Sequence, residues 1–298
     1  MTKTLTKKAY AKINLSLDVL KRRPDGYHEV RMIMQTVGIY DTLTFSVFKD
    51  NDLSGTSIEL KVTDKDLDLG PMKKNLIYRA AKMIVEEKDI KNTRILITLK
   101  KNIPVAAGMA GGSTDAACVF HGLNELLALG MSLDDMCSLG VKLGADIPYC
   151  IKGGCAISEG IGEILTPIAA PPEAVLLIAK PDINVSTKFV YENLHANELK
   201  THPDVDSMIE AISNQDLTKM SQVLGNVLET VTTKEYPVID KIKTIMKDQG
   251  ALGALMSGSG PTVFGLFDPQ DRDKAKEALK AVKEAVPDVQ IFITGFIN

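Results

Sequence analysis

The sequence is poor in the residues that mark disulfide-rich or metal-binding proteins. It has four cysteines in 298 residues, and none of them forms a C-x-x-C pair. Most of these cysteines stand among apolar neighbours, so we expect small buried side chains rather than disulfides or metal ligands. They are Cys118, Cys137, Cys150 and Cys155.

Long apolar runs and an excess of one charge are also lacking. No run approaches the ~18 residues that a membrane-spanning helix needs, and residues 1–8 lack the apolar segment of a secretion signal. A formal net charge of −3 gives no reason to expect a nucleic acid or an anionic membrane as partner. We therefore expect a cytoplasmic protein whose partners are small molecules.

Composition and periodicity indicate an ordinary globular chain, with 45% hydrophobic and 24% charged residues. Apolar alternation and helical stripes interleave irregularly, which favours the α+β class. The length suits two domains, and we place them at residues 1–160 and 161–298. Strands are predicted at residues 9–20, 30–37, 42–47, 57–62, 94–99, 174–179, 253–256, 262–267 and 289–294. Helices are predicted at residues 75–87, 113–129, 132–143, 186–194, 206–212, 270–285 and from 236 to Gly250.

The most informative stretch is PVAAGMAGGSTDAA, residues 104–117, between a predicted strand and a predicted helix. Glycines let backbone N–H groups approach a phosphate, and a helix start adds free N–H groups and a positive dipole end. The stretch lacks the lysine of a Walker A loop and the spacing of a Rossmann fingerprint. An ordinary glycine-rich turn capped by Ser113 is the alternative.

Two further stretches accompany it: YAKINLSLDV at residues 10–19 and LMSGSGPTVFGLF at residues 255–267. Together, and in this order, the three resemble the motifs of the GHMP kinases. Residues 22–37, with Asp25-Gly26-Tyr27-His28, and residues 143–167, with Gly-Ala-Asp-Ile-Pro, resemble one branch of that family. That branch phosphorylates the 2-hydroxyl of a cytidine diphosphate-linked methylerythritol in the non-mevalonate route to isoprenoid precursors.

The resemblance implies a two-domain GHMP kinase fold with a deep interdomain cleft. Its N-terminal, ATP-binding domain is ribosomal-protein-S5-domain-2-like, and its C-terminal domain is a ferredoxin-like α/β sandwich. The implied reaction transfers the γ-phosphoryl group of ATP with Mg²⁺ as cofactor, in a monomer or homodimer.

Two residues are expected to carry the chemistry. Phosphoryl transfer needs positioned charge and an acceptor for the hydroxyl proton. Asp146 follows a helix stop and precedes Ile147-Pro148, so it is either a turn-stabilising aspartate or a base. Lys12 stands in an apolar strand, either as a snorkelling edge residue or as a placed cation. The resemblance implies that Asp146 is the base, or a group that orients the hydroxyl, and that Lys12 is its cationic partner.

The acceptor is expected to contact four residues. Asn14 shares a strand face with Lys12, and the resemblance implies that it binds the acceptor; a plain structural amide is the alternative. Tyr27 can stack on a pyrimidine and His28 can hydrogen-bond a base edge, although such a pair is often surface or core filler. Asp146 completes the set.

ATP is expected to lie along the glycine-rich stretch and against Asn75 and Lys101. The alternatives are that Asn75 serves as a helix N-cap and that Lys101 is a solvated charge. The magnesium ligands stay unknown, with Ser113 or Thr114 as candidates. The glycine-richest version of the family motif has glycine where this sequence has alanine, at residues 106, 107 and 110. Positive φ angles are therefore in question at these three positions. The expected ATP-binding residues are Pro104, Gly108, Ala110, Gly111, Gly112, Ser113, Thr114, Asn75 and Lys101.

Two other functions remain open from the sequence. One is a kinase of another small alcohol, such as homoserine or mevalonate, although a small acceptor needs no base-recognition pair like Tyr27 and His28. The other is a non-catalytic binding protein on the same scaffold, against which the presence of both Lys12 and Asp146 argues.

Overall fold

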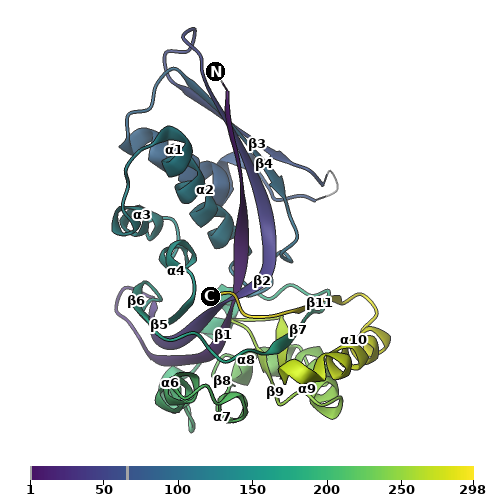
Figure 1. Cartoon of the computed structure of the whole chain (residues 1–298). Coiled ribbons are helices and arrows are strands. Elements are labelled where there is room, and N and C mark those ends of the chain that lie inside the picture. The colour runs from purple at the N-terminus through teal and green to yellow at the C-terminus, as the bar shows by residue number, and fades with distance from the viewer. Residues whose placement is uncertain (1, 65–66) are drawn as a thin grey trace. The chain divides into compact units, whose positions relative to one another are not determined.

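The computed structural model describes residues 2–64 and 67–298 (Figure 1). Its contacts divide the chain into two compact units. Unit 1 holds the N-terminal residues through Ala11, Tyr40–Ile103 and Ala110–Lys152, and unit 2 holds Lys12–Ile39, Pro104–Met109 and Gly153–Asn298. Each unit is therefore built from three separate segments. The sequence analysis divides the chain once, between residues 160 and 161, into two continuous domains. That division stays a prediction.

Unit 1 packs helices against a sheet. Residues 42–49 of β2 pair with β4 in antiparallel register, and β4 pairs with β3 in parallel. Helices α1 and α2 lie side by side over this sheet, and α4 packs against both α2 and α3 (Figure 1). The bounds are β1 Lys3–Arg22, β2 His28–Lys49, β3 Thr56–Val62, β4 Thr93–Lys100, η1 Met72–Lys74, α1 Leu76–Glu87, α2 Gly111–Leu127, α3 Leu133–Gly140 and α4 Ile147–Lys152.

The core of unit 1 follows directly from the sequence pattern. The apolar residues of β4 alternate inward, and α1 presents a stripe of Ile77, Ala80, Ala81 and Ile84. Gly122 of α2 lies so close to the sheet that an added Cβ would stand 2.5 Å from the Phe45 ring. Glycine at residue 122 therefore lets α2 pack directly on β2.

Unit 2 contains a four-stranded antiparallel sheet in the order β11-β7-β10-β9, on which α9 and α10 pack (Figure 1). Residues 30–35 of β2 pair with β5, β5 pairs with β6, and Ser16 and Leu17 of β1 pair with β8. The strands are β5 Cys155–Gly160, β6 Ile164–Pro167, β7 Val175–Lys180, β8 Gly225–Asn226, β9 Gly253–Met256, β10 Val263–Phe267 and β11 Gln290–Thr294. The helices are α5 Thr187–Glu192, η2 Ala196–Glu198, α6 Val205–Ser213, α7 Leu217–Gln222, α8 Glu229–Glu235, α9 Val238–Asp248, η3 Pro269–Asp271 and α10 Arg272–Ala285.

Most predicted elements are confirmed, but the break between residues 37 and 42 is wrong. β2 runs without interruption through Gly38 and Asp41. A Cβ at Gly38 would stand 2.5 Å from Thr294 Oγ1, so this glycine serves a close approach rather than a turn. Asp41 is fully buried, and its carboxylate accepts hydrogen bonds from residues 101–103, so it can lie within a strand rather than in an exposed turn. The α+β class is confirmed.

The cysteines are unpaired thiols, as the sequence predicts. All four cysteines are free, two of them buried and two half-buried. Burial raises the pKa of both Cys118 and Cys155 to about 12. Across residues 2–64 and 67–298, no helix combines the length and the apolar character that crossing a membrane requires.

Candidate active site

The glycine-rich stretch leaves the end of β4 and enters α2 through left-handed backbone. φ is +51° at Ala106, +68° at Gly108 and +56° at Ala110. Helix α2 begins at Gly111, two residues earlier than predicted, and Ala110 is its N-cap. Ser113 lies inside the helix, so the alternative of a turn capped by Ser113 is wrong, and alanine at the N-cap has no side-chain acceptor. The N–H groups of this helix start therefore have no side-chain cap at the N-cap position, as a phosphate-binding helix start requires.

Three stretches that the sequence singled out meet within unit 2. The Lys12 amide donates to the Met109 carbonyl at 3.2 Å, and Ser257 Oγ donates to the Gly108 carbonyl at 3.0 Å. A Cβ at Gly258 would lie 3.1 Å from the Gly108 oxygen and 3.6 Å from Asn14 Oδ1. The turn at residues 257–260 and the strand at residues 12–14 thus hold the middle of the glycine-rich stretch.

The turn at residues 257–260 is itself fixed by residues that the sequence analysis did not single out. Asn226 Nδ2 donates to the carbonyls of Met256 and Gly258, both at 2.8 Å. The hydroxyls of Thr187 and Ser259 are hydrogen-bonded at 2.7 Å. No local pattern could have identified Asn226 or Thr187, because their partners lie dozens of residues away.

Lys12 and Asn14 point to the same face of β1 and contact each other. Lys12 Nζ donates to Asn14 Oδ1 at 2.8 Å, and Asn14 Nδ2 is 3.2 Å from Met32 Sδ. Lys12 is 5% exposed and Asn14 is fully buried, so the snorkelling reading of Lys12 is wrong. A buried cation with an amide partner matches the placed-cation alternative.

Lys101 is buried in unit 1 between two aspartates and is not a solvated charge. Its ammonium pairs with Asp41 and lies 2.8 Å from Asp115 Oδ2. Burial lowers the pKa of Lys101, but the carboxylates of Asp115 and Asp41 outweigh it and the pKa is raised overall. Burial raises the pKa of Asp115 to about 8, against the opposing pull of Lys101. Sequence reasoning missed Asp41, which lies in mid-strand, sixty positions before Lys101.

Lys101 also lies beside the start of α2. A Cβ at Gly111 would stand 3.0 Å from Lys101 Nζ and 3.1 Å from Ile103 Cγ2, so a glycine there relieves a tight approach. In the next turn, Thr114 is buried and its Oγ1 donates to the Tyr10 carbonyl at 2.6 Å. Ser113 is half-buried. Of the two hydroxyls considered for magnesium, Thr114 is thus committed to the backbone and Ser113 is the better candidate.

Asn75 is confirmed as the N-cap of α1. Its Oδ1 accepts from the Ile77 amide at 2.9 Å. The cap uses the side-chain oxygen, which leaves the Nδ2 donor for a base edge. The capping role and the predicted adenine contact are therefore compatible.

The predicted base-recognition pair adjoins an aromatic residue that sequence reasoning missed. Tyr27 is 59% exposed, and its amide donates to Asp25 Oδ1 at 3.1 Å. The His28 ring is half-buried, with its centroid 5.1 Å from that of Tyr191 at 42°. Burial, and secondly the charge of Arg22, lower the pKa of His28, so its imidazole is neutral at pH 7.

Asp146 directly precedes α4, a helix that the sequence analysis did not predict. Its carbonyl accepts from the Cys150 amide at 3.0 Å, and its side chain is half-buried in unit 1. Lys12 belongs to unit 2, so the predicted pairing of these two residues stays a prediction.

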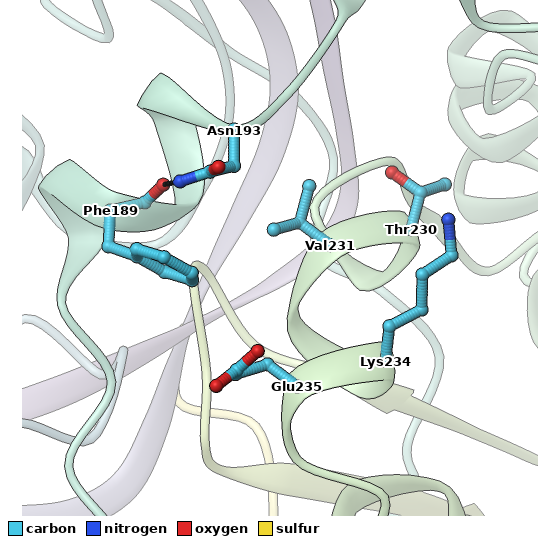
Figure 2. Close-up of a pocket in the computed structure, with 6 residues that line it drawn as sticks. All are labelled: Phe189, Asn193, Thr230, Val231, Lys234 and Glu235. Atoms are coloured by element: carbon cyan, nitrogen blue, oxygen red, sulfur yellow. Dashed lines mark hydrogen bonds between the residues drawn. The ribbon is translucent and has the colours of Figure 1, made fainter.

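A separate hollow of about 250 Å³ lies between α5 and α8 (Figure 2). Its lining is mixed, with the Phe189 ring on one side and the charged Lys234 and Glu235 on the other, and Asn193 Nδ2 donates to the Phe189 carbonyl at 2.8 Å. None of the residues predicted for ATP, acceptor or catalysis lines it. Among the described residues, no group of three or more His, Cys, Asp or Glu could hold a metal ion.

Comparison with known proteins gives the class to which this fold and these motifs belong. Residues 75–154 match the model of the GHMP kinases N terminal domain, and residues 208–287 match that of the GHMP kinases C terminal. These two regions cover more than half of the chain. The chain belongs to the GHMP kinase family, and it is a kinase.

The curated relatives narrow this class. A protein of Lachnoclostridium phytofermentans named 4-diphosphocytidyl-2-C-methyl-D-erythritol kinase is 50% identical over 292 residues, covering 98% of this chain and 97% of its own. A Geobacillus protein of the same name is 50% identical over 265 residues, covering 89% of each chain.

Solved structures agree with this placement. A crystal structure of 4-(cytidine 5'-diphospho)-2C-methyl-D-erythritol kinase matches with a TM-score of 0.81 and 28% identity, covering 99% of this chain and 100% of its own. A homoserine kinase from Cytophaga hutchinsonii matches with a TM-score of 0.77 at 19% identity, covering 98% of this chain and 94% of its own. At 19% identity, the match to the homoserine kinase shows that the two proteins share a fold.

Proposed function

We propose that this kinase transfers the γ-phosphoryl group of ATP to the 2-hydroxyl of 4-diphosphocytidyl-2-C-methyl-D-erythritol, giving the 2-phosphate and ADP. The observation that carries the proposal is 50% identity over 98% of the chain to a protein named for this acceptor. The homoserine kinase shares the fold at 19% identity, which supports no transfer of its substrate. The product would serve isoprenoid precursor synthesis in the cytoplasm, where ATP is supplied, with the enzyme as monomer or homodimer.

Recognition of the cytidine end is assigned to the aromatic group around His28. A neutral imidazole has one donor and one acceptor nitrogen, so it can match a base edge that offers both. Tyr27 is exposed and Tyr191 packs against His28, so both rings offer faces for a pyrimidine. A small acceptor such as homoserine would leave these three side chains without a role.

ATP binding is assigned to the glycine-rich stretch and the start of α2. The uncapped N–H groups at Gly111 and Gly112 and the positive dipole end suit the phosphates. Asn75 keeps one amide donor for the adenine edge, as its cap geometry allows. Mg²⁺, when bound with ATP, would neutralise phosphate charge, and Ser113 is the hydroxyl of this chain that we assign to it.

The chemical roles fall to Asp146, Lys12 and Asn14. Asp146 would accept the proton of the 2-hydroxyl, or orient that hydroxyl for attack on the γ-phosphorus. Lys12 would neutralise charge that develops during transfer. Asn14 accepts from the Lys12 ammonium at 2.8 Å and thereby fixes its direction. Its contact with the acceptor rests on the family resemblance.

Acceptor-dependent ADP release by the purified protein tests the proposal. With Mg²⁺-ATP, release should require the cytidyl acceptor and should not occur with homoserine or mevalonate. Asp146→Asn should lower kcat by at least ~100-fold, the lower range for loss of a general base. Asp134→Asn is a matched control, because that carboxylate is 89% exposed in the same unit and its ion pair with Lys152 lies on the surface.

Each outcome decides a separate part of the proposal. Turnover of homoserine or mevalonate in place of the cytidyl acceptor would refute the assigned substrate while the enzyme class stands. Equal kcat in Asp146→Asn and in the wild type would remove Asp146 from the chemistry. Asp134→Asn should keep wild-type kinetics in either case.

A further inference from the structure

Asp41 is a buried carboxylate to which the sequence assigns no role. It lies in β2 with a fully buried side chain, and it pairs with a lysine that is 8% exposed. Buried ion pairs contribute little to stability compared with apolar packing, because removing charges from water costs several kcal/mol. The position of this carboxylate therefore calls for a reason beyond stability.

The two oxygens of Asp41 are directed at one short segment, the end of β4. Oδ1 accepts from the amides of Asn102 and Ile103, at 2.5 and 2.8 Å. Oδ2 accepts from the Lys101 ammonium. One carboxylate thus holds three consecutive residues immediately before Pro104, where the glycine-rich stretch starts.

Lys101 extends this constraint to the other end of the stretch. Its ammonium lies 2.8 Å from Oδ2 of Asp115, in the first turns of α2, and it stands beside Gly111. The side chain of Asp115 is 4% exposed, and its Oδ1 is buried without a hydrogen-bond partner among the described residues. Lys101 therefore links Asp115 to Asp41.

We propose that Asp41 is a positioning residue for ATP binding. It fixes the strand end that leads into the phosphate-binding stretch and, through Lys101, the helix start that follows it. The inference rests on the proposed binding of ATP phosphates by this stretch. It assigns Asp41 no contact with ATP or with the acceptor.

The carboxylate is needed because donors approach it from both sides. An asparagine at residue 41 can accept from the amides of Asn102 and Ile103, but its NH₂ group then faces the Lys101 ammonium. If the amide is reversed, its NH₂ group faces the two backbone N–H groups. Asp41→Asn keeps the size of the side chain and breaks one half of the link in either orientation.

The test is the kinetics of Asp41→Asn, measured well below the midpoint of thermal unfolding so that the protein is folded. The KM for ATP should rise about tenfold or more, since a displaced phosphate cradle weakens binding in ground and transition state alike. The KM for the cytidyl acceptor should change by less than about twofold. If the role of Asp41 were merely structural, Asp41→Asn would lower the unfolding temperature and leave the KM for ATP unchanged relative to the KM for the acceptor.

Asp50→Asn is the matched control. Asp50 directly follows the same strand, and its carboxylate also accepts from a cation, Arg94, and from a backbone amide, that of Asp52. It lies nine residues along the chain from Asp41, roughly 30 Å in an extended strand. The KM for ATP should be that of the wild type.

Two results would overturn the proposal. One is a wild-type KM for ATP in folded Asp41→Asn while the wild-type enzyme is active. If Asp41→Asn does not fold, Asp115→Leu replaces it. That change removes the helix-start acceptor of Lys101 and leaves the contacts of Asp41 with residues 101–103 in place. A wild-type KM for ATP in that variant is the second result, because the link from Asp41 to the helix start would then have no effect on ATP binding. Failure of the proposed function is distinct, since the wild type would then show no acceptor-dependent turnover.

Discussion

Gly108→Ala perturbs the point at which the glycine-rich stretch meets the turn at residues 257–260. Gly108 has φ of +68°, and an added Cβ would contact the Ser257 carbonyl oxygen and lie 3.0 Å from the Gly260 oxygen. Both contacts are with backbone atoms, which cannot move aside as a flexible side chain can. The substitution therefore forces either the stretch or the turn to shift.

The expected loss of stability has two parts. Left-handed backbone costs a non-glycine residue about 1–2 kcal/mol, and overpacking against a rigid neighbour adds about 1–3 kcal/mol. Gly108→Ala should thus cost ~2–5 kcal/mol of unfolding free energy by these two effects. Gly154→Ala is the control: φ is +75° in the same unit, with nothing within 4 Å of the added Cβ, so only the first part applies.

Urea unfolding followed by far-UV circular dichroism measures the difference between the two variants. The KM for ATP should rise about tenfold or more in Gly108→Ala, because the stretch is displaced, and should be unchanged in Gly154→Ala. Equal loss of stability in the two variants would refute the steric argument. A wild-type KM for ATP in Gly108→Ala would show that the turn at residues 257–260 does not position the phosphate-binding stretch.

Three further predictions concern strain, protonation and thiol reactivity. Ala110→Gly should stabilise the protein by up to about 1 kcal/mol, since φ is +56° there; Ala107→Gly, outside that φ region, should destabilise it, and the same sign for both would contradict the strain argument. The KM for the acceptor should be level from pH 8 to 7 and should rise only at a pH below the usual histidine pKa of about 6.5, where neutral His28 becomes protonated. Because the folded-state pKa of His28 is lowered, the unfolded state binds the proton first. Stability should therefore fall as pH drops below the unfolded-state pKa of about 6.5. His28→Asn should lose both effects, and an unchanged pH profile in this variant would assign them to another group. At pH 8 a thiol reagent should leave Cys118 and Cys155 unmodified until the protein unfolds, because burial raises the pKa of each to about 12; rapid modification of either in the native protein would contradict its burial.

The elements that the sequence predicted well are those whose signal is local. The stripe of α1 and its cap at Asn75 lie within one short segment, and the structure confirms both. The end of β4 and the glycine-rich stretch were recognised for the same reason. The start of α2 was placed two residues late, since Ala110 adopts a left-handed conformation that alanine rarely takes.

The parts of the site that the sequence did not predict depend on contacts between distant residues. The break predicted between residues 37 and 42 contains Gly38, whose role is to let Thr294 approach β2. It also contains Asp41, whose partner Lys101 lies sixty residues away. Tyr191 could not be linked to His28, because nothing in the pattern of either segment refers to the other.

The division of unit 2 into three segments affects how the protein forms during synthesis. The last segment of unit 1 ends at residue 152, whereas residues 12–39 and 104–109 belong with the C-terminal segment. Gly108 receives its hydrogen bond from Ser257, 149 residues later, which a ribosome adds roughly 7–30 s after it adds Gly108. A nascent chain therefore holds Gly108 well before the turn that binds it, and we expect a chain truncated before that turn to lack the proposed ATP binding.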